Sequence, residues 1–345
     1  MAEHSAGILA TGSYVPKDEI DNAEVARRAG ATAESIGRET RTRTRRYAAP
    51  DEAASDLAAR AAERALARAG VPADRIDYLV VSTATGDFPQ PPTAHLVQNA
   101  IDAHRATCFD IGASGSGFLY GLDLVRGLLR LHGGGLALVI CTEVFSRFID
   151  FADHRTAALL GDGAAAALVG PVPSGHGLLR TVLSGPGDAP GALRIRAGGS
   201  RVPPSHDSVA AGGHHVTADR RATPDSARAH GPAALAGLVR DAGYGPERID
   251  HLMAHRSAGP PPWELARASG LRNARAHCTV EEYGDIGSAS LPLTLDLVDR
   301  AGLLRDGDLV LLAGLDGGTA IGASLMRWSV PGRPASDGRD GRRHP

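Results

Sequence analysis

The first side chains to consider as a nucleophile, a metal ligand or a proton carrier are the three cysteines and a histidine that ends an apolar run. The three cysteines, Cys108, Cys141 and Cys278, show no Cys-x-x-Cys spacing, which argues against a metal site or a disulfide framework. Two of them lie in apolar, strand-like runs, TCFDIG and LVICTE, where a free cysteine behaves as a small hydrophobic residue. His255 ends another apolar run, and a histidine in such a place is more often structural than catalytic.

The segments that must position these residues alternate between strand and helix, which predicts an α/β protein. Helical patterns cover residues 54–69, 118–131, 232–241 and 291–301. Short apolar runs, predicted as strands, cover residues 78–82, 107–111, 137–141, 164–169, 251–255 and 309–312.

Two stretches of the chain are alike, AGVPADRIDYLVVS and AGYGPERIDHLMAH. Each has a helix end, a Gly/Pro turn and an Arg-Ile-Asp leading into a strand, so we expect two duplicated halves. We place the halves at residues 1–170 and 226–330. Residues 171–225, rich in Gly, Pro, Ser and His, are predicted as an irregular connection, and residues 331–345 as a disordered tail.

Composition excludes several classes of protein. With 37 basic and 39 acidic residues the formal net charge is -2, which argues against a nucleic-acid-binding protein. No signal peptide is recognisable at the start, and no apolar run reaches the roughly 18 residues of a membrane span. We therefore expect a cytoplasmic protein without a bound metal.

Several stretches, in order, resemble the ketoacyl synthase III (FabH-like) family of the thiolase superfamily over about residues 6–330. They are GILATGSYVPKDEIDNAEV, TRRYAAPDEAASDLAARAAERAL, CFDIGASGSGFLYGL, LLGDGAAAALV, HLMAHRSA, EEYGDIGSASLPLTLD and LLAGLDGGTAIGASLMRW. The resemblance implies a five-layered αβαβα thiolase-like fold made of two duplicated halves. It also implies a homodimer, and thioester substrates in place of a permanently bound cofactor.

The family's nucleophile motif, Asp-x-x-x-x-Cys-x-Gly-Phe, matches Asp110 to Phe118 without a gap, and its cysteine position is Gly115. Cys108 lies on the preceding strand and cannot replace the missing thiol. Ser114 and Ser116 flank Gly115. In a tight turn neighbouring side chains point in different directions, so we expect both to pack, with a surrogate nucleophile at Ser116 or Ser114 as the alternative.

His255 falls on the family's catalytic histidine, and Asp285 falls where the family has asparagine. Asparagine can donate a hydrogen bond to a developing enolate, whereas an ionised aspartate can only accept and would repel that charge. An aspartate beside a histidine instead orients the ring and stabilises imidazolium, as in hydrolase triads. The pair therefore favours deprotonation of an alcohol or amine. Some FabH-like acyltransferases of antibiotic pathways show the same replacement.

The resemblance also assigns the oxyanion hole and the donor site. The backbone N–H groups of Gly115 and Gly317 match the family's oxyanion donors, and backbone donors need no side chain. Residues expected to meet a phosphopantetheine or an acidic carrier protein are Arg43 and Arg45, within a cluster that includes Arg41 and Arg46, together with Arg256; a solvated charge run is the alternative for the cluster.

Recognition of the donor and the acceptor departs from the family pattern. Ser35 and Glu39 replace the family's adenine-stacking tryptophan and nucleotide-binding arginine, so an acyl carrier protein is favoured over coenzyme A as the donor. Residues 86–93 (GDFPQPPT) and the region of His214 and His215 are expected to shape the acceptor pocket.

Three functions are compatible with these residues. The first is a FabH-like acyltransferase of polyketide or other antibiotic biosynthesis, which moves an acyl group from a carrier-protein or coenzyme A thioester to a sugar, cyclitol or similar hydroxyl or amine. The second is a ketoacyl synthase III condensing enzyme whose nucleophile has been changed to Gly115 by mutagenesis. The third is a non-catalytic partner of a true ketosynthase.

Overall fold

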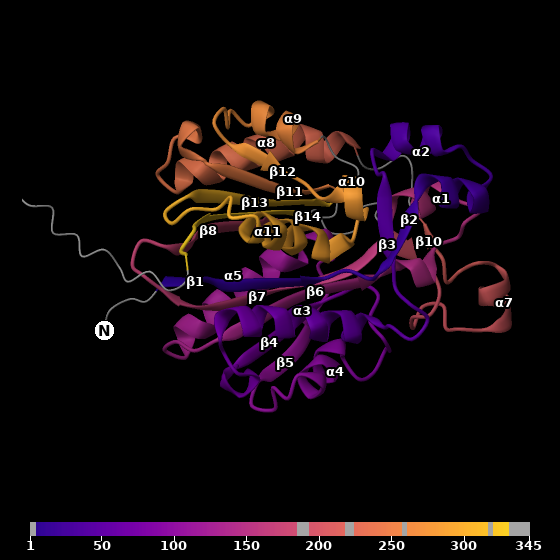
Figure 1. Cartoon of the computed structure of the whole chain (residues 1–345), viewed down its shortest axis with the longest axis horizontal. Coiled ribbons are helices and arrows are strands. Elements are labelled where there is room, and N and C mark those ends of the chain that lie inside the picture. Colours follow the sequence, from indigo (N-terminus) through magenta and orange to yellow (C-terminus); the bar gives the residue numbers. More distant parts are fainter. Residues whose placement is uncertain (1–4, 185–192, 218–223, 257–260, 317–319, 331–345) are drawn as a thin grey trace, which may run out of the picture.

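A computed structural model of the chain describes residues 5–184, 193–217, 224–256, 261–316 and 320–330 (Figure 1). Two five-stranded sheets form its centre. The first sheet has the order β1 (Ser5–Tyr14), β7 (Asp162–Val172), β6 (Ala137–Val144), β4 (Tyr78–Ser82) and β5 (Thr107–Ile111). The second has the order β8 (Gly177–Ser184), β14 (Ala320–Arg327), β13 (Leu309–Asp316), β11 (His251–Arg256) and β12 (Arg275–His277).

The two sheets share one plan, which confirms the duplication predicted from the sequence repeat. In the first, β4 is parallel to β5 and β6, while β7 is antiparallel to β6 and β1. In the second, β11 is parallel to β12 and β13, while β14 is antiparallel to β13 and β8. Tyr78 and His251 each follow the repeated Arg-Ile-Asp, and each pairs with the corresponding residue of the neighbouring strand, Ala137 and Val310, respectively. The repeat therefore extends to the register of the strands.

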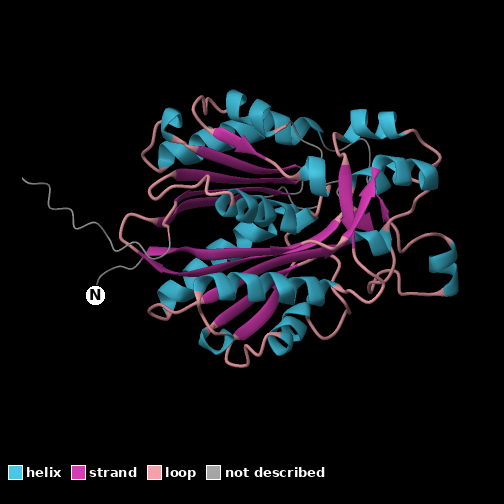
Figure 2. Cartoon of the chain, in the orientation of Figure 1, coloured by secondary structure: helices cyan, strands magenta, loops and turns pink. Residues whose placement is uncertain are grey.

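Helices cover both sheets and fill the space between them, giving the expected five αβαβα layers (Figures 1 and 2). One outer layer contains α3 (Ala54–Ala69) and α4 (Thr93–Ala100), and the other contains α8 (Pro224–Asp241) and α9 (Pro262–Ala268). The central layer contains α5 (Gly117–Leu131) and α11 (Ser290–Arg300), whose apolar faces join strands of both sheets in one core.

Small residues allow these layers to pack closely. The inner face of α3 is largely alanine, including the fully buried Ala58, Ala61 and Ala65. A Cβ atom on Gly12 of β1 would lie only 2.4 Å from the backbone nitrogen of Ala65. The helix therefore rests almost directly on the strand, as the low aromatic content of the chain suggests.

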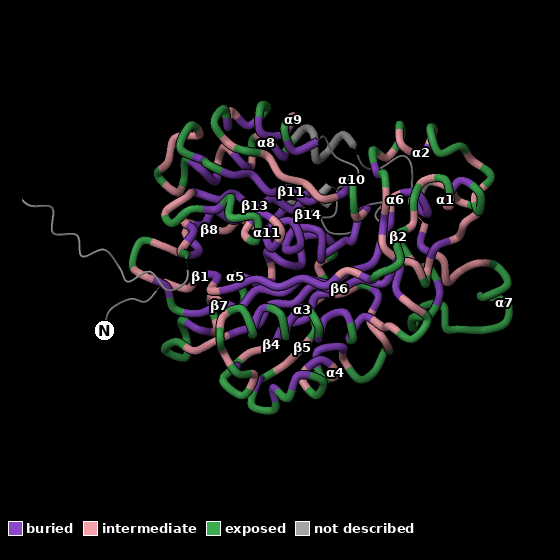
Figure 3. Tube along the Cα trace, viewed as in Figure 1, coloured by how far each residue is buried: buried purple, intermediate pink, exposed green. Residues whose placement is uncertain are grey.

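A smaller group of elements lies at one end of the layers, at the right of Figure 1. It contains β2 (Asp18–Asp21), α1 (Asn22–Ala29), α2 (Ala33–Thr40), β3 (Thr44–Tyr47), α6 (His154–Leu159), β9 (Arg194–Ile195), α7 (His206–Ala210), β10 (Val216–Thr217) and α10 (Val280–Tyr283). Figure 3 shows that the strands of the two main sheets are largely buried, whereas much of α1, α2 and α7 is exposed.

The prediction of an irregular connection over residues 171–225 is wrong for part of that segment. It contains β8, which pairs with β14 from Ser184–Ile321 to Gly177–Arg327 and closes one edge of the second sheet. The apolar residues of the run GLLRTVLS are interrupted by Arg180 and Thr181, as suits an edge strand that is only partly buried. The predicted tail, residues 331–345, lies outside the described residues.

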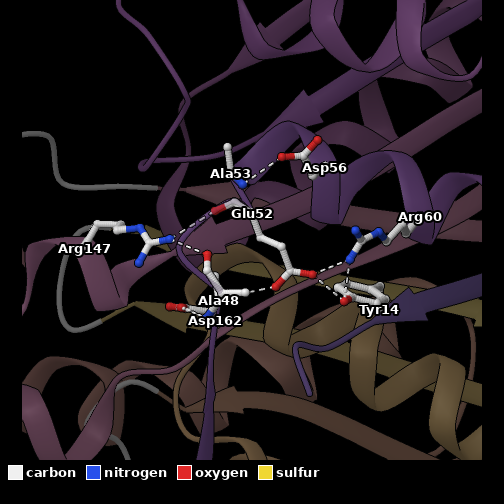
Figure 4. A network of polar contacts seen from close by, with 9 residues as sticks. Tyr14, Ala48, Glu52, Ala53, Asp56, Arg60, Arg147 and Asp162 are labelled. Carbon is white, nitrogen blue, oxygen red and sulfur yellow. Dashed lines mark hydrogen bonds and ion pairs between the residues drawn. The ribbon is translucent and has the colours of Figure 1, made fainter. Parts of the chain in front are cut away.

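A polar network fixes the connection from β3 to α3 (Figure 4). Tyr14 donates to Glu52, and Arg60 donates to both of these residues. On the other side, the Asp162 carboxylate accepts hydrogen bonds from the Ala48 backbone N–H at 2.7 Å and from Ser146. Burial raises the pKa of Asp162 to about 6. The network anchors the Gly161–Asp162 turn, which in turn contacts the candidate site.

Candidate active site

Two chain turns and the end of a strand meet where the two halves of the molecule join. The first is η2 (Ser114–Ser116), which follows β5 and leads into α5. The second is η5 (Gly287–Ala289), which leads into α11 in the equivalent place of the other half. The two turns pack against each other, and η2 also packs against β13. His255, at the end of β11, contributes its side chain to this junction.

The structure brings His255 and Asp285 together in a buried hydrogen bond. His255 Nε2 lies 2.8 Å from Asp285 Oδ1, and the side chains are 2% and 1% exposed, respectively. Asp285 Oδ1 also accepts the backbone N–H of Gly287 at 2.8 Å. With Asp285 ionised, the proton of the imidazole hydrogen bond resides on Nε2 of His255. The aspartate therefore holds both the orientation and the tautomer of the ring.

The second carboxylate oxygen of Asp285 has a different environment. Asp285 Oδ2 is buried and has no hydrogen-bond partner among the described residues. A buried oxygen without a donor costs about 1–3 kcal/mol, so such an atom in a native protein calls for an explanation. A substrate O–H or N–H group that donates to Oδ2 would satisfy it.

Backbone contacts hold Asp285 in place from the opposite half. Its N–H donates to the Leu159 carbonyl at 2.7 Å, and its own carbonyl accepts the Gly161 N–H at 3.0 Å. A Cβ atom on Gly161 would lie 2.4 Å from the Tyr283 carbonyl oxygen, and Gly284 has a φ of +71°. These glycines permit the close crossing of the chains, which explains the marked GDGA turn of the sequence.

Gly115 is buried at the centre of η2, at the start of the α5 turn. Ser114, which precedes it, is exposed and has a φ of +49°, a left-handed conformation that costs energy for a non-glycine residue. Ser116 is fully buried, and its hydroxyl donates to the Gly314 carbonyl at 3.3 Å. A Cβ on Gly314 would lie 2.9 Å from Ser116 Oγ, so this hydroxyl is packed against β13, which favours the packing role over that of a nucleophile. Gly317 lies outside the described residues.

The two cysteines of the first half are poorly suited to replace a nucleophile. Cys141 is fully buried in β6, and burial raises its pKa well above the usual thiol value. Burial also raises the pKa of Cys108, whose thiol donates to Gln98 Oε1 at 3.1 Å on β5. Because the thiolate is the reactive form, a raised pKa makes both thiols weaker candidates for the nucleophile.

The predicted donor residues differ in their exposure. Arg43 is 68% exposed and pairs with Glu282 of α10 at 3.3 Å, so its guanidinium is available to a ligand. The prediction for Arg45 is wrong: the residue is fully buried, and its guanidinium donates to Asn22 and to the carbonyls of Ile20 and Ala158. Arg256 ends β11, and its side chain is not among those described.

Exposed aromatic surface that the sequence did not single out lies beside Arg41, two residues before Arg43 in the chain. Trp263, near the start of α9, is 52% exposed, and the Arg41 guanidinium carbon lies 5.6 Å from the centre of its ring. The contact joins the end of α2 to the start of α9. We call Arg41, Arg43 and Trp263 the rim.

Other predicted residues make local contacts. The Ser35 hydroxyl donates to the Thr32 carbonyl within α2. Glu39 and His215 lie near His154 and Asp150, respectively, at 3.9 and 3.8 Å. The rings of His214 and His215 have their centres 4.0 Å apart and are tilted by 49° to each other.

The segment at residues 86–93 is anchored at both of its ends. Asp87 accepts hydrogen bonds from the N–H and hydroxyl of Ser55 on α3, at 2.9 and 2.6 Å. At the other end Asp110, the first residue of the nucleophile motif, accepts the N–H groups of Thr93 and Ala94 at 2.7 Å each. The motif aspartate therefore holds the first turn of α4.

Among the described residues, no three His, Cys, Asp or Glu side chains are arranged to hold a metal ion. Within the same part of the chain, no helix is both long and apolar enough to cross a membrane.

Comparison with known proteins gives the same family that the site suggests. The model of 3-oxoacyl-[acyl-carrier-protein] synthase III matches residues 109–195, and the model of its C-terminal part matches residues 239–328. An acetoacetyl CoA synthase, NphT7, of Streptomyces sp. (strain CL190) is 40% identical over 323 residues, covering 93% of this chain and 98% of the relative. A β-ketoacyl-[acyl-carrier-protein] synthase III of Symbiobacterium thermophilum is 36% identical, covering 95% and 99%.

Solved structures of the same family share the fold. FabH of Pseudomonas aeruginosa PAO1 aligns with a TM-score of 0.81 at 30% identity, covering 94% of this chain and 98% of that one. The priming β-ketosynthase of the R1128 polyketide pathway aligns with a TM-score of 0.82 at 27% identity, covering 95% and 97%. The chain therefore belongs to the FabH-like ketoacyl-acyl-carrier-protein synthase III family of the thiolase superfamily, a family of acyl-transferring condensing enzymes.

Proposed function

We propose that this chain is an acyltransferase that moves an acyl group from a thioester directly to a hydroxyl or amine acceptor, without a covalent acyl-enzyme. The observation that carries the proposal is the Asp285 carboxylate. Its Oδ1 atom is bonded to His255 Nε2, and its Oδ2 atom is buried without a partner among the described residues. An acceptor O–H or N–H group that donates to Oδ2 would be held beside its proton acceptor.

The position of Oδ2 also argues against decarboxylative condensation. An asparagine at residue 285 could keep its oxygen on His255 Nε2 and place its NH₂ group where Oδ2 now lies. That amide would donate to an enolate oxygen, whereas the carboxylate oxygen would repel it. A single atom thus separates a site that stabilises an enolate from one that accepts a proton.

The proposed reaction balances without a protein nucleophile. The acceptor oxygen or nitrogen attacks the thioester carbonyl carbon, and its proton passes to the His255–Asp285 pair. The negative charge on the carbonyl oxygen is stabilised by the backbone N–H groups of Gly115 and Gly317, the positions of the family's oxyanion donors. The C–S bond then breaks, and the leaving thiolate takes the proton back from the pair.

The donor in this proposal is a phosphopantetheine thioester that approaches over the rim. The names of the relatives refer both to coenzyme A and to acyl carrier protein, and both carry this arm. The exposed Arg43 guanidinium suits its phosphate, and the Trp263 ring, which the Arg41 guanidinium contacts, offers an apolar face. Similarity to a priming ketosynthase of a polyketide pathway supports a polyketide synthase as the source of the acyl group.

We also propose that the chain acts as a homodimer that pairs across β5. This strand lies at the edge of the first sheet and pairs only with β4 among the described strands. Thr107 and Asp110 on it are exposed. An unpaired edge at the strand that leads into η2 would be covered by a second copy related by a two-fold axis.

The acyl transfer is tested by incubating the protein with an acyl carrier thioester and a panel of sugars, cyclitols and amines. Acyl product that disappears in His255→Ala supports the proposal, and an unchanged rate in that variant rules out the assigned base. A condensing enzyme with an altered nucleophile is the second candidate, favoured by the names of the relatives. It predicts that Gly115→Cys releases carbon dioxide from a malonyl thioester.

A further inference from the structure

A second buried carboxylate, Glu143, lies next to the site and takes no part in the proposed proton transfer. It is near the end of β6 and is 1% exposed. Its oxygens accept hydrogen bonds from the Ala84 N–H at 3.1 and 3.2 Å and from the Thr85 hydroxyl at 2.7 Å. Both of these donors belong to the loop after β4, in the same half of the molecule.

The remaining donor to Glu143 comes from the other half. Ser288, at the centre of η5, donates its hydroxyl to Glu143 Oε1 at 2.9 Å, and its backbone N–H also hydrogen-bonds Glu143. The same hydroxyl lies 3.1 Å from the Ser82 carbonyl. Gly287, the preceding residue, has a φ of +50°, and a Cβ atom there would lie 3.3 Å from Glu143 Cγ. Glu143 is therefore packed against the turn as well as bonded to it.

The same turn holds Asp285. The N–H group of Gly287 donates to Asp285 Oδ1, the oxygen that also binds His255 Nε2. A chain of contacts thus leads from Glu143 through Ser288 and Gly287 to the His255–Asp285 pair. Placing a carboxyl group in the interior is costly, and burial raises the pKa of Glu143 to about 7. A neutral residue would avoid that cost, so the carboxylate needs a reason beyond packing.

We propose that Glu143 is a positioning residue that fixes η5 and thereby sets the Asp285 carboxylate against His255. The inference rests on the proposed function of that pair as the proton acceptor. It predicts that loss of the Glu143–Ser288 hydrogen bond loosens the Asp285–His255 bond even though neither of those residues is changed. If the Glu143–Ser288 hydrogen bond only joined the two halves, its loss would lower the stability of the protein and leave the His255 imidazole unaffected.

The test is a nitrogen-15 NMR measurement of the histidine rings, which reports the protonation of each ring nitrogen without requiring turnover. The resonances of His255 are assigned by their absence in His255→Gln. The variants compared are Glu143→Gln, which removes the charge, and Ser288→Ala, which removes the side-chain donor, so that both weaken the link. The matched controls are Thr85→Val and Asp296→Asn, which leave the contacts of Ser288 unchanged. Thr85 donates to Glu143 from its own half, and Asp296 is a fully buried carboxylate that accepts from Thr11 and Ser13, away from η5.

In the wild-type protein we expect His255 to carry a proton on Nε2. In Glu143→Gln and in Ser288→Ala the His255 pKa should fall by about one pH unit, because imidazolium loses part of its aspartate partner. Where acyl transfer is measurable, kcat should fall about tenfold with little change in KM. Thr85→Val and Asp296→Asn should leave both the His255 pKa and kcat unchanged.

Two results would overturn this role for Glu143. One is an unaltered His255 titration in Ser288→Ala and Glu143→Gln together with a lowered melting temperature. The other is a wild-type His255 without a proton on Nε2. Ser288→Ala is the milder change and serves if Glu143→Gln does not fold. If no acceptor is acylated by any form, the proposed function fails, while the NMR comparison still decides the role of Glu143.

Discussion

His255 Nε2 and Asp285 Oδ1 lie 2.8 Å apart, and both side chains are almost completely buried. His255 lies near the end of β11, and Asp285 lies in the segment between α10 and η5. The two residues meet only when the second half of the molecule is folded. The hydrogen bond uses one carboxylate oxygen, and the other is buried without a partner among the described residues. In the proposed function that second oxygen meets the acceptor, so the two oxygens have different roles.

Replacing Asp285 by asparagine should convert a site that accepts a proton into one that donates a hydrogen bond to an enolate. Asp285→Asn should lower acyl transfer by about 10²–10³-fold, because the pair can no longer take the proton. Gly115→Cys alone should restore an acylated thiol but little decarboxylation. The double variant Gly115→Cys/Asp285→Asn should release carbon dioxide from a malonyl thioester faster than Gly115→Cys, measured with labelled substrate. Equal release from the two would show that residue 285 does not set the chemistry.

Substitutions at Arg45 and Arg43 should affect different properties, the first the stability of the fold and the second the binding of the donor. Arg45→Met leaves the carbonyls of Ile20 and Ala158 and the Asn22 side chain without their donor, so it should lower the free energy of unfolding by about 2–4 kcal/mol. Arg43→Ala, at an exposed pair, should change it by less than about 0.5 kcal/mol but raise KM for the thioester. Urea unfolding and steady-state kinetics of both variants check this; a KM effect confined to Arg45→Met would reverse the assignment.

Trp263 offers an optical test of the rim. The chain has two tryptophans, and Trp328 is 2% exposed, so a change of fluorescence on ligand addition reports on Trp263. A non-hydrolysable acyl-pantetheine phosphate should change the emission of the wild-type protein and not that of Trp263→Ala. KM for the thioester should rise about fivefold in Trp263→Ala, which corresponds to about 1 kcal/mol, and much less in Trp263→Phe. No response in the wild-type protein would place the donor elsewhere.

Glu143 should give stability a recognisable pH dependence. Burial raises the pKa of its carboxyl from the ordinary 4.5 to about 7, so the folded protein holds the proton more tightly than the unfolded chain. The stability from this group is present below about pH 4.5 and is lost as pH rises to about 7, by about 3 kcal/mol. Glu143→Gln should lack this loss. The free energy of unfolding of both proteins, measured with urea over pH 5–8, checks this. Two curves that run parallel with pH would contradict the raised pKa of Glu143.

The regular elements were readable from the sequence because their signals are local. The spans predicted for α3, β4 and β5 agree with the structure at both ends, since each is bounded by turn residues and has an unbroken pattern. The duplication was visible for the same reason, as the Arg-Ile-Asp before β4 recurs before β11. Strand β8 was missed because Arg180 and Thr181 interrupt its apolar residues.

The site was predictable only in part. His255 and Asp285 stand at positions that the family resemblance could assign, but which carboxylate oxygen meets which ring nitrogen depends on the packing of η5. Arg45 looked like its neighbours in a run of arginines, although the alternation of β3 buries Arg45 and Tyr47 and leaves Thr44 and Arg46 partly exposed. Glu143 and Ser288 are 145 residues apart, and no local pattern marks either of them.

The most direct test of the account is intact-mass spectrometry of the wild-type protein during turnover with an acyl carrier thioester and an acylatable acceptor. Direct transfer predicts that acylated acceptor accumulates while the protein mass stays that of the unmodified chain, and that Gly115→Cys acquires the mass of one acyl group. Acyl mass on the wild-type protein that forms and disappears at the rate of product formation would contradict the account, because a protein side chain would then be the nucleophile.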